Sequence, residues 1–334
     1  MRDRAARTRT GLTAKHQPAS LEQDTRVRVD LAHLRGFEGK ARSLRFLPAQ
    51  PAGSVLNGRH ASRLRGRGLN FEELRGYLPG DDPRTIDWKV TARTGKAHVR
   101  VYSEERDRPV LLVVDQRMTM FFGTRLNMKS VTAAEAAALT AFRVLDQGDR
   151  VGGIVFGDDY VAEVRPKRSQ TARDQFLSTL VKANQQLSAT NPGTEDPQTL
   201  NRVLGMVARA APRNHLVVVF SDFDGIDRST ERLVGQISRH NDLILCPVTD
   251  PISSEIPKDL KVVVSDGDLQ VELDTTSKDT HARLSEFATG RLAGVLLWQH
   301  KFGVPVLPLS SGKDTVTQIR HLTGLAPRNR RSRR

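Results

Sequence analysis

The sequence predicts an α/β protein built on a doubly wound, mainly parallel sheet. From residue 110 onward, apolar runs of strand length alternate with longer segments whose apolar residues recur at helical spacing. Two of the runs, Val110–Val114 and Leu216–Phe220, hold only apolar residues, as parallel strands buried on both faces do. Strands of this kind that alternate with helices give a sheet covered by helices on both faces.

Gly, Asp and Pro residues interrupt this alternation and set the predicted bounds. The predicted strands are Val110–Asp115, Val151–Phe156, Tyr160–Val164, Leu216–Phe220, Leu243–Val248 and Val304–Leu309. The predicted helices are Lys129–Leu145, Gln170–Gln186, Thr199–Ala210, Asp227–Arg239, Thr280–Phe302 and Asp314–His321. Gly157 begins the turn of one strand pair, and a second hairpin is expected over Lys261–Leu273 with its turn at Asp266–Asp268.

Residues 30–109 differ in composition. They are rich in Arg, Gly and Leu, turn residues recur, and His98–Ser103 alternates polar and apolar side chains like a strand. We expect this strand beside Val110–Val114, in a small, partly β satellite domain packed on the sheet edge. Residues 1–29 are expected to be a basic, disordered tail, 110–312 the α/β domain, and 313–334 a short helix with a basic tail.

The net charge of +14 is unevenly distributed. Residues 1–109 carry 23 Lys and Arg against 13 Asp and Glu, residues 328–334 add five arginines, and residues 110–327 balance at 24 against 25. The basic ends favour phosphate-rich, anionic-lipid or acidic protein partners without choosing among them. Arg59, Arg63, Arg65 and Arg67 are the candidate anion-binding residues of a nucleic-acid alternative, although no aromatic residue lies between them for base stacking.

Apolar runs stay far below the ~20 residues that span a bilayer, and no apolar segment follows the basic start as in a secretory signal. Cys246 is the only cysteine and lies in an apolar run, so we expect a buried thiol, no disulfide within the chain and no Cys-based zinc site. A reducing, cytoplasmic setting fits best, with peripheral attachment to the inner membrane left open.

Carboxylates and hydroxyls follow the two most apolar strands. Asp115 ends one strand, with Thr119 beyond it, and Ser221, Asp222 and Asp224 follow the other. The carboxyl ends of parallel strands meet at the same edge of a sheet, where open α/β folds place their ligand sites. Such an oxygen-rich group suits a hard cation such as Mg²⁺, and capping of the following loops and helices is the alternative.

This order of elements, with Asp at the first strand end and Ser-Asp at a later one, resembles a von Willebrand factor A domain. The upstream run RGYLPGDDPRTIDWKVTARTG and the following EERDRPVLLVVD resemble the bacterial family known as domain of unknown function fifty-eight, over residues 30–310. The resemblance implies an A-like domain encoded beside a MoxR-type AAA+ ATPase. It also implies a divalent-cation site formed by Asp-x-Ser-x-Ser, a Thr in a middle loop and an Asp after the fourth strand.

The chain departs from that pattern at the first hydroxyl. It reads DQRMT from Asp115 to Thr119, so Arg117 stands where a Ser ligand belongs, and arginine has donors only and stays charged. The middle-loop threonine is Thr199 or, less well placed, Thr194. The candidate metal residues are therefore Asp115, Thr119, Thr199, Asp222 and Asp224.

We expect Arg117 to act as a built-in cation that pairs with Asp115 or Asp222 where a metal would sit, so that no cofactor is needed. The alternative is that Arg117 points outward to a partner and that a weakened Mg²⁺ or Mn²⁺ site remains.

The loop PGDDPRTIDWK holds a second group of candidates. Asp81, Asp82 and Asp87 would suit a metal-dependent hydrolase, whereas turn chemistry, in which Asp caps its own backbone, explains them structurally. No nucleophile–base pair stands out, and the phosphate-binding motif GxxxxGK[ST] is absent. Asp81 and Asp82 are candidate partner-binding residues together with Arg84 and Arg117.

The sequence thus favours a non-enzymatic adaptor. By resemblance it would work with a MoxR-type AAA+ ATPase in the assembly, maturation or remodelling of client proteins. Recognition would take place at the sheet edge, where Arg117 would capture a partner's carboxylate. A nucleic-acid or anionic-surface binder and a metal-dependent hydrolase are the alternatives.

Overall fold

The computed structural model describes residues 24–42, 44, 69–104, 108–188, 199–253, 261–265, 270–274 and 278–322. The chain divides into two compact units, one formed by Met1–Phe46 with Pro109–Arg334 and the other by Leu47–Arg108. We call the first the α/β unit and the second the satellite unit.

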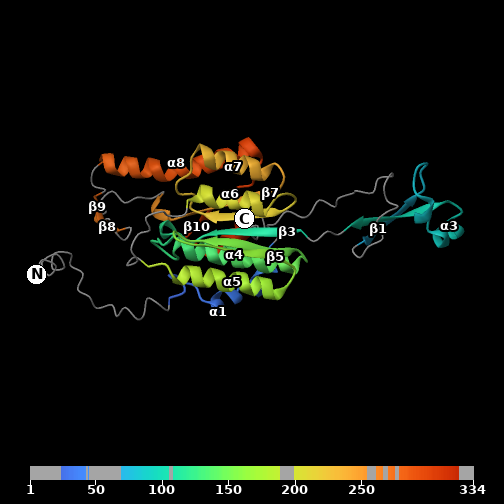
Figure 1. The fold of residues 1–334 in the computed structure, drawn as a ribbon, viewed down its shortest axis with the longest axis horizontal. Coiled ribbons are helices and arrows are strands. Elements are labelled where there is room, and N and C mark those ends of the chain that lie inside the picture. The colour runs from blue at the N-terminus through green and yellow to red at the C-terminus, as the bar shows by residue number, and fades with distance from the viewer. Residues whose placement is uncertain are drawn as a thin grey trace, which may run out of the picture. The chain divides into compact units, whose positions relative to one another are not determined.

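A six-stranded sheet forms the centre of the α/β unit (Figure 1). Its strands are β3 (Pro109–Asp115), β4 (Arg150–Phe156), β5 (Val161–Lys167), β6 (Leu216–Ser221), β7 (Asp242–Thr249) and β10 (Leu309–Ser310). They lie in the order β10-β7-β6-β3-β4-β5, and all neighbours are parallel except β5, which returns antiparallel to β4. The predicted doubly wound, mainly parallel sheet is confirmed.

Helices cover both faces of this sheet (Figure 1). One face carries α4 (Lys129–Asp146) and α5 (Gln170–Gln185), and the other carries α6 (Leu200–Ala210), α7 (Arg228–Ser238) and α8 (Lys278–Phe302). At the start of three of these helices, a side-chain oxygen accepts hydrogen bonds from backbone N–H groups that have no partner within the helix. Ser169 caps α5, Thr199 caps α6 and Asp227 caps α7 in this way. Apolar residues of β3, β4, β6 and β7 form one core with α6, α7 and α8.

The segment before the satellite unit belongs to the α/β unit, which corrects the predicted boundary at residue 30. Two short helices, α1 (Leu31–Arg35) and α2 (Glu38–Ala41), pack on α4. Val29 and Leu44 are fully buried, and the Val29 N–H donates to Asn184 Oδ1 of α5 at 2.8 Å. Residues 24–29, predicted as tail, are therefore part of the fold, while residues 1–23 lie outside the described ranges.

The last strand is shorter than the predicted Val304–Leu309. Only its final residue and Ser310 pair with β7 as a strand, and a single bridge joins Val306 to β7. Pro305 and Pro308 have no N–H to donate to a ladder, which explains the interruption. The chain then forms α9 (Thr315–Leu322), which packs on α4.

The satellite unit contains an antiparallel pair of strands. β1 (Leu69–Gly76) pairs with β2 (His98–Glu104), and η3 (Pro83–Thr85) and α3 (Trp88–Thr94) lie between them in the chain. The predicted strand over residues 98–103 is thus present, but its expected place beside β3 is wrong. β3 has β4 on one edge and β6 on the other, so it has no free edge to offer β2.

A separate hairpin forms over the predicted residues 261–273. β8 (Lys261–Ser265) pairs antiparallel with β9 (Gln270–Asp274), and the turn between them lies outside the described residues. Within the part of the chain that the structure describes, no helix is long and apolar enough to cross a membrane.

Candidate functional site

The two most apolar strands end side by side. β3 lies between β4 and β6, and the register pairs Val114 with Phe220. From β3 the chain crosses to β4 on one side and later adds β6 on the other, so the carboxyl ends of β3 and β6 form the switch point where doubly wound folds place ligands. We call the residues that follow these two strand ends, from Asp115 to Lys129 and from Ser221 to Asp224, the sheet mouth.

Asp115, at the end of β3, is completely buried and uses both carboxylate oxygens. Its Oδ2 accepts the Ser221 hydroxyl at 2.6 Å and Arg117 Nη2 at 2.8 Å. Its Oδ1 accepts the backbone N–H of Arg117 at 3.0 Å and Arg117 Nε at 3.1 Å. Charge-assisted, nearly bidentate bonds of this kind hold the carboxylate in one orientation.

Arg117 is an internal cation of the sheet mouth. Its Nη2 lies 3.9 Å from Asp222 Oδ1, so one guanidinium reaches the carboxylates of both strands and confirms their predicted convergence. Burial lowers the pKa of Arg117, but the carboxylates of Asp115, Asp222 and Asp224 more than compensate and the net shift is upward. The guanidinium also lies over the Phe156 ring, with its carbon 5.6 Å from the ring centroid.

Because the Arg117 side chain is only 8% exposed and bonded to Asp115, it is poorly placed to reach a partner's carboxylate. The predicted pairing with Asp115 is present, whereas the predicted direct contact with a partner does not fit this burial. The sequence places an arginine two residues after Asp115 but does not show which way its side chain points.

Two further basic side chains complete the sheet mouth. Lys129 Nζ, at the start of α4, lies 2.7 Å from Asp222 Oδ2. Arg291 of α8 lies 2.5 Å from Asp224 Oδ1 and 3.9 Å from Asp222 Oδ2. Burial raises the pKa of Asp222, but Lys129, Arg117 and Arg291 outweigh it and hold that pKa below its usual range. Asp115, Asp222 and Asp224 thus each meet a cation, and a fourth carboxylate, Asp158, accepts the Met118 N–H at 2.7 Å.

Sequence reasoning missed both of these cations. Lys129 carried a weak signal, since it begins the helix that follows the loop after Asp115. Arg291 carried none, because it lies in the middle of a long helix far along the chain.

The donor set does not fit a bound metal ion. Mg²⁺ prefers carboxylate, hydroxyl and water oxygens, and here the guanidinium of Arg117 takes the Asp115 oxygens that such an ion would need. Thr119 is exposed on η4 (Met118–Met120), and Thr199 is exposed and accepts the Arg202 N–H as the cap of α6. Among the described residues, no group of three or more His, Cys, Asp or Glu side chains could hold a metal, and Thr194 lies outside them.

The backbone after β6 is strained at the sheet mouth. Phe223 is fully buried and adopts a left-handed conformation with φ of 55°, which is uncommon for a bulky residue. Its N–H donates to Ser221 Oγ at 2.9 Å, and its ring packs edge-on against Trp298 of α8 with centroids 6.3 Å apart. Strain of this kind persists only where the surroundings hold it, and α8 supplies part of that support.

The rim of the sheet mouth carries a closed loop, residues 122–129, which we call the rim loop. Its ends meet through the Lys129 N–H, which donates to the Phe122 carbonyl at 2.8 Å. A Cβ on Gly123 would lie 2.2 Å from the Asn127 carbonyl oxygen, so only glycine fits this close approach.

Contacts below the rim loop hold it in place. Thr124 donates from its N–H and its hydroxyl to Asp250, which follows β7, and the Asn127 N–H donates to the Ser311 carbonyl. Phe122 and Leu126 nevertheless remain 40% and 39% exposed. The rim loop is thus a fixed segment that presents apolar side chains beside an ionic network.

The candidate residues of the satellite unit have structural roles. Asp81 accepts both terminal nitrogens of Arg75 at 2.7 and 2.8 Å and the Leu78 N–H at 2.9 Å. Asp82 accepts the Arg84 N–H as the cap of η3, and Asp87 caps α3. The predicted turn chemistry is present at all three carboxylates.

Of the remaining basic candidates, only Arg84 lies within the described residues. The Arg84 side chain is exposed and stays a candidate for partner contact. The arginines at positions 59, 63, 65 and 67 and the tail 328–334 lie outside the described residues, so their predicted anion binding stays a prediction.

The family model described as Protein of unknown function DUF58 matches residues 73–293. The chain belongs to this family. The DUF58 match begins in β1 of the satellite unit and ends in α8, so it spans the Asp81–Asp82 turn and the whole sheet mouth, Arg291 included. The predicted family resemblance is confirmed.

Relatives of this DUF58 protein are found in mycobacteria. Uncharacterized proteins of Mycobacterium bovis and Mycobacterium tuberculosis are 28% identical to it over 312 residues, which are 92% of this chain and 95% of each relative. Among solved structures it is similar to the conserved hypothetical protein BatB from Bacteroides thetaiotaomicron, with a TM-score of 0.39 and 10% identity over 65% of this chain and 96% of that one.

Proposed function

We propose that this DUF58 protein is a non-enzymatic adaptor with a von Willebrand factor A-like domain that binds a MoxR-type AAA+ ATPase and its client proteins. The observation that carries the proposal is the composition of the sheet mouth. Asp115, Asp222 and Asp224 each have a basic side chain against them, and the rim loop beside them presents exposed apolar residues. The ion pairs therefore hold the sheet mouth in one conformation, and the rim loop offers an apolar surface for a partner.

The same ion pairs argue against catalysis. A general acid or base needs a proton that exchanges near neutral pH and access to a substrate. Asp115 is fully buried, and the pKa of Asp222 is held below its usual range by Lys129, Arg117 and Arg291, against the opposing effect of burial. Neither carboxylate meets both conditions, which supports binding rather than turnover.

In the proposed mode the sheet mouth works without a metal ion. A divalent cation in an A-like site would hold the strand-end carboxylates and offer positive charge to a partner. Here Arg117, Lys129 and Arg291 hold those carboxylates, and their charges are already matched within the protein. The partner therefore gains little from charge at this site and meets the rim loop instead, where burial of apolar surface contributes about 25 cal/mol per Å².

The adaptor is proposed to act in the cytoplasm, where the buried thiol of Cys246 stays reduced. Its role there would be the assembly, maturation or remodelling of client proteins driven by the ATPase.

Binding of the full-length chain to the MoxR-type ATPase encoded in the same genome, measured by biolayer interferometry with ATP and Mg²⁺, tests this proposal. The double variant Phe122→Ser/Leu126→Ser removes the apolar side chains of the rim loop. We expect at least about tenfold weaker binding, because burying two large apolar side chains contributes roughly 2 kcal/mol or more.

The matched control is Leu296→Ser/Leu297→Ser, since both leucines are exposed on α8 and outside the rim loop. It should leave binding unchanged. The proposal is wrong if the parent protein does not bind the ATPase, or if both double variants weaken binding equally.

A further inference from the structure

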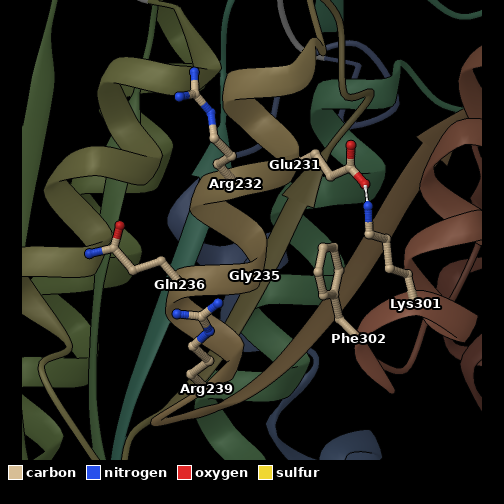
Figure 2. Close-up of a pocket in the computed structure, with 7 residues that line it drawn as sticks. All are labelled: Glu231, Arg232, Gly235, Gln236, Arg239, Lys301 and Phe302. Atoms are coloured by element: carbon tan, nitrogen blue, oxygen red, sulfur yellow. Dashed lines mark hydrogen bonds and ion pairs between the residues drawn. The ribbon is translucent and has the colours of Figure 1, made fainter.

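A groove of about 480 Å³ lies between α7 and α8, away from the sheet mouth (Figure 2). Gly235 of α7 and Phe302 of α8 form its floor, and Figure 2 shows Arg232 and Arg239 on either side of Gly235 along α7. Glu231 and Lys301 form a wall, where their ion pair of 2.5 Å joins the two helices.

The groove exists because α7 has no side chain at Gly235. A Cβ on Gly235 would lie 3.0 Å from Phe302 Cε1, closer than most real contacts. The glycine therefore lets the Phe302 ring approach the α7 backbone and leaves a shallow apolar floor between the arginines. Glycine in the middle of a helix costs about 0.5–1 kcal/mol relative to alanine, so its presence in α7 calls for a packing reason of this kind.

The charges around the floor are not matched. Lys301 is paired with Glu231, but the Arg232 guanidinium bonds only to neutral acceptors, Ser229 Oγ at 2.9 Å and the Arg228 carbonyl at 3.4 Å. Arg239, the residue that follows α7, has an exposed side chain. Within the described residues, neither Arg232 nor Arg239 has a carboxylate partner.

We propose that this groove binds an acidic, amphipathic helix of a partner protein. Arg232 and Arg239 are seven residues apart, which is two helical turns or about 10 Å along α7. Carboxylates two turns apart on a partner helix match that spacing, and an apolar side chain between them lies over Phe302. A helix that docks in a groove through such regularly spaced anchors is a common mode of peptide recognition.

The floor favours a peptide over a nucleic acid. A phosphate backbone has no apolar group to cover Phe302, and it would carry its charges past the Glu231 carboxylate on the wall. A peptide can place its two carboxylates at the arginines and an apolar residue elsewhere. This inference stands apart from the proposed role of the sheet mouth, because none of its residues belongs to that network.

Fluorescence anisotropy with the full chain at physiological salt tests the groove. The probe is a labelled helical peptide, AQAEAALLAAEAQA, whose two glutamates are two turns apart with leucines between them. One comparison peptide has glutamine at both glutamate positions, and another has alanine at both leucine positions. Each should bind more weakly than the probe, because the first lacks the charges and the second lacks the apolar contact.

The protein variant is Arg232→Glu/Arg239→Glu, which should weaken binding of the probe at least about tenfold by turning two attractions into repulsions. The matched control, Arg209→Glu/Arg213→Glu, makes the same charge change at two exposed arginines that do not line the groove. It should change the affinity by less than about twofold.

Three results would each overturn the proposal. In the first, the parent protein does not bind the probe. In the second, the alanine peptide binds as tightly as the probe, or the control variant weakens binding as much as the groove variant does. Either outcome would assign the binding to general charge attraction. In the third, a single-stranded oligothymidylate displaces the probe and loses affinity in the groove variant, which would assign the arginines to phosphates.

Discussion

Each unit of the protein contains an aspartate that forms a two-bond ion pair with an arginine close to it in sequence. In the α/β unit, Arg117 donates from Nε and Nη2 to Asp115, whose carboxylate also accepts the Arg117 backbone N–H. In the satellite unit, Arg75 donates from both terminal nitrogens to Asp81, whose carboxylate also accepts the Leu78 N–H. The local chemistry of the two pairs is nearly the same.

Their surroundings are not the same. Asp115 is fully buried, and its arginine is shared with the carboxylate of Asp222 and joined by Lys129 into one network. The Arg75 and Asp81 side chains are 26% and 9% exposed, against 8% and 0% for Arg117 and Asp115, and the Arg75–Asp81 pair closes a turn. The comparison teaches that a bidentate pair near solvent stabilises the conformation of a loop. In the interior, the same pair must stay intact, because a buried charge without its partner is strongly destabilising.

The largest expected difference between the two pairs is in stability. Arg117→Ala leaves the buried Asp115 carboxylate without its cation, so the free energy of unfolding should fall by about 3–5 kcal/mol, measured by urea denaturation. Arg75→Ala should lower it much less, because water can solvate Asp81 once the arginine is gone.

A double variant sharpens this result. Arg117→Met/Asp115→Asn removes both charges and keeps an oxygen for the Ser221 hydroxyl, so it should recover most of the lost stability. Equal losses for Arg117→Ala and Arg75→Ala would show that burial does not separate the two pairs.

The next difference is in the dependence of stability on acid. The pKa of Asp222 lies below its usual range because Lys129, Arg117 and Arg291 outweigh the effect of burial. This group therefore adds stability above the unfolded pKa of about 3.9, and the contribution is lost as the pH falls through the lower folded pKa.

Asp222→Asn removes that contribution. The variant should be less stable than the parent near neutral pH, and the two unfolding free energies should converge as the pH falls below about 4. Arg75, and after it the Leu78 N–H, also hold the pKa of Asp81 below its usual range, but that pair closes an exposed turn, so Asp81→Asn should give a smaller change of the same sign. A constant difference between parent and Asp222→Asn across this range would contradict the assignment.

The smallest expected signal is the response to metal. Isothermal titration of Mg²⁺ into the EDTA-treated parent should give no binding heat, because Arg117 holds the oxygens of Asp115. Arg117→Ser places a hydroxyl at this position and frees those oxygens, so weak binding should appear, and adding Lys129→Gln should strengthen it by freeing Asp222.

Arg75→Ser is the control in the satellite unit, where a single freed carboxylate at Asp81 should bind no metal. Binding heat in the parent protein would show that the sheet mouth accepts a cation despite Arg117.

Most of the fold was predictable because its signals are local. The apolar strands β3 and β6, the spacing within α4 and the caps at Thr199 and Asp227 each lie within a few residues of the element that they define. The failures involve distant partners. α1 and α2 are too short to show a clear periodicity, and β2 was paired with the wrong strand because the free edges of a sheet depend on its whole strand order.

The sequence by itself determined that Asp115 ends a buried strand and that an arginine follows it two residues later, since both follow from residue type and order. Only the tertiary structure decided how that charge is used. The packing of α4 and α8 at the strand ends brings Lys129 to Asp222 and Arg291 to Asp222 and Asp224. It also leaves Arg117 buried. The physical reason is that ion pairing depends on distance in space, and the residues that meet at the sheet mouth come from segments far apart in the chain.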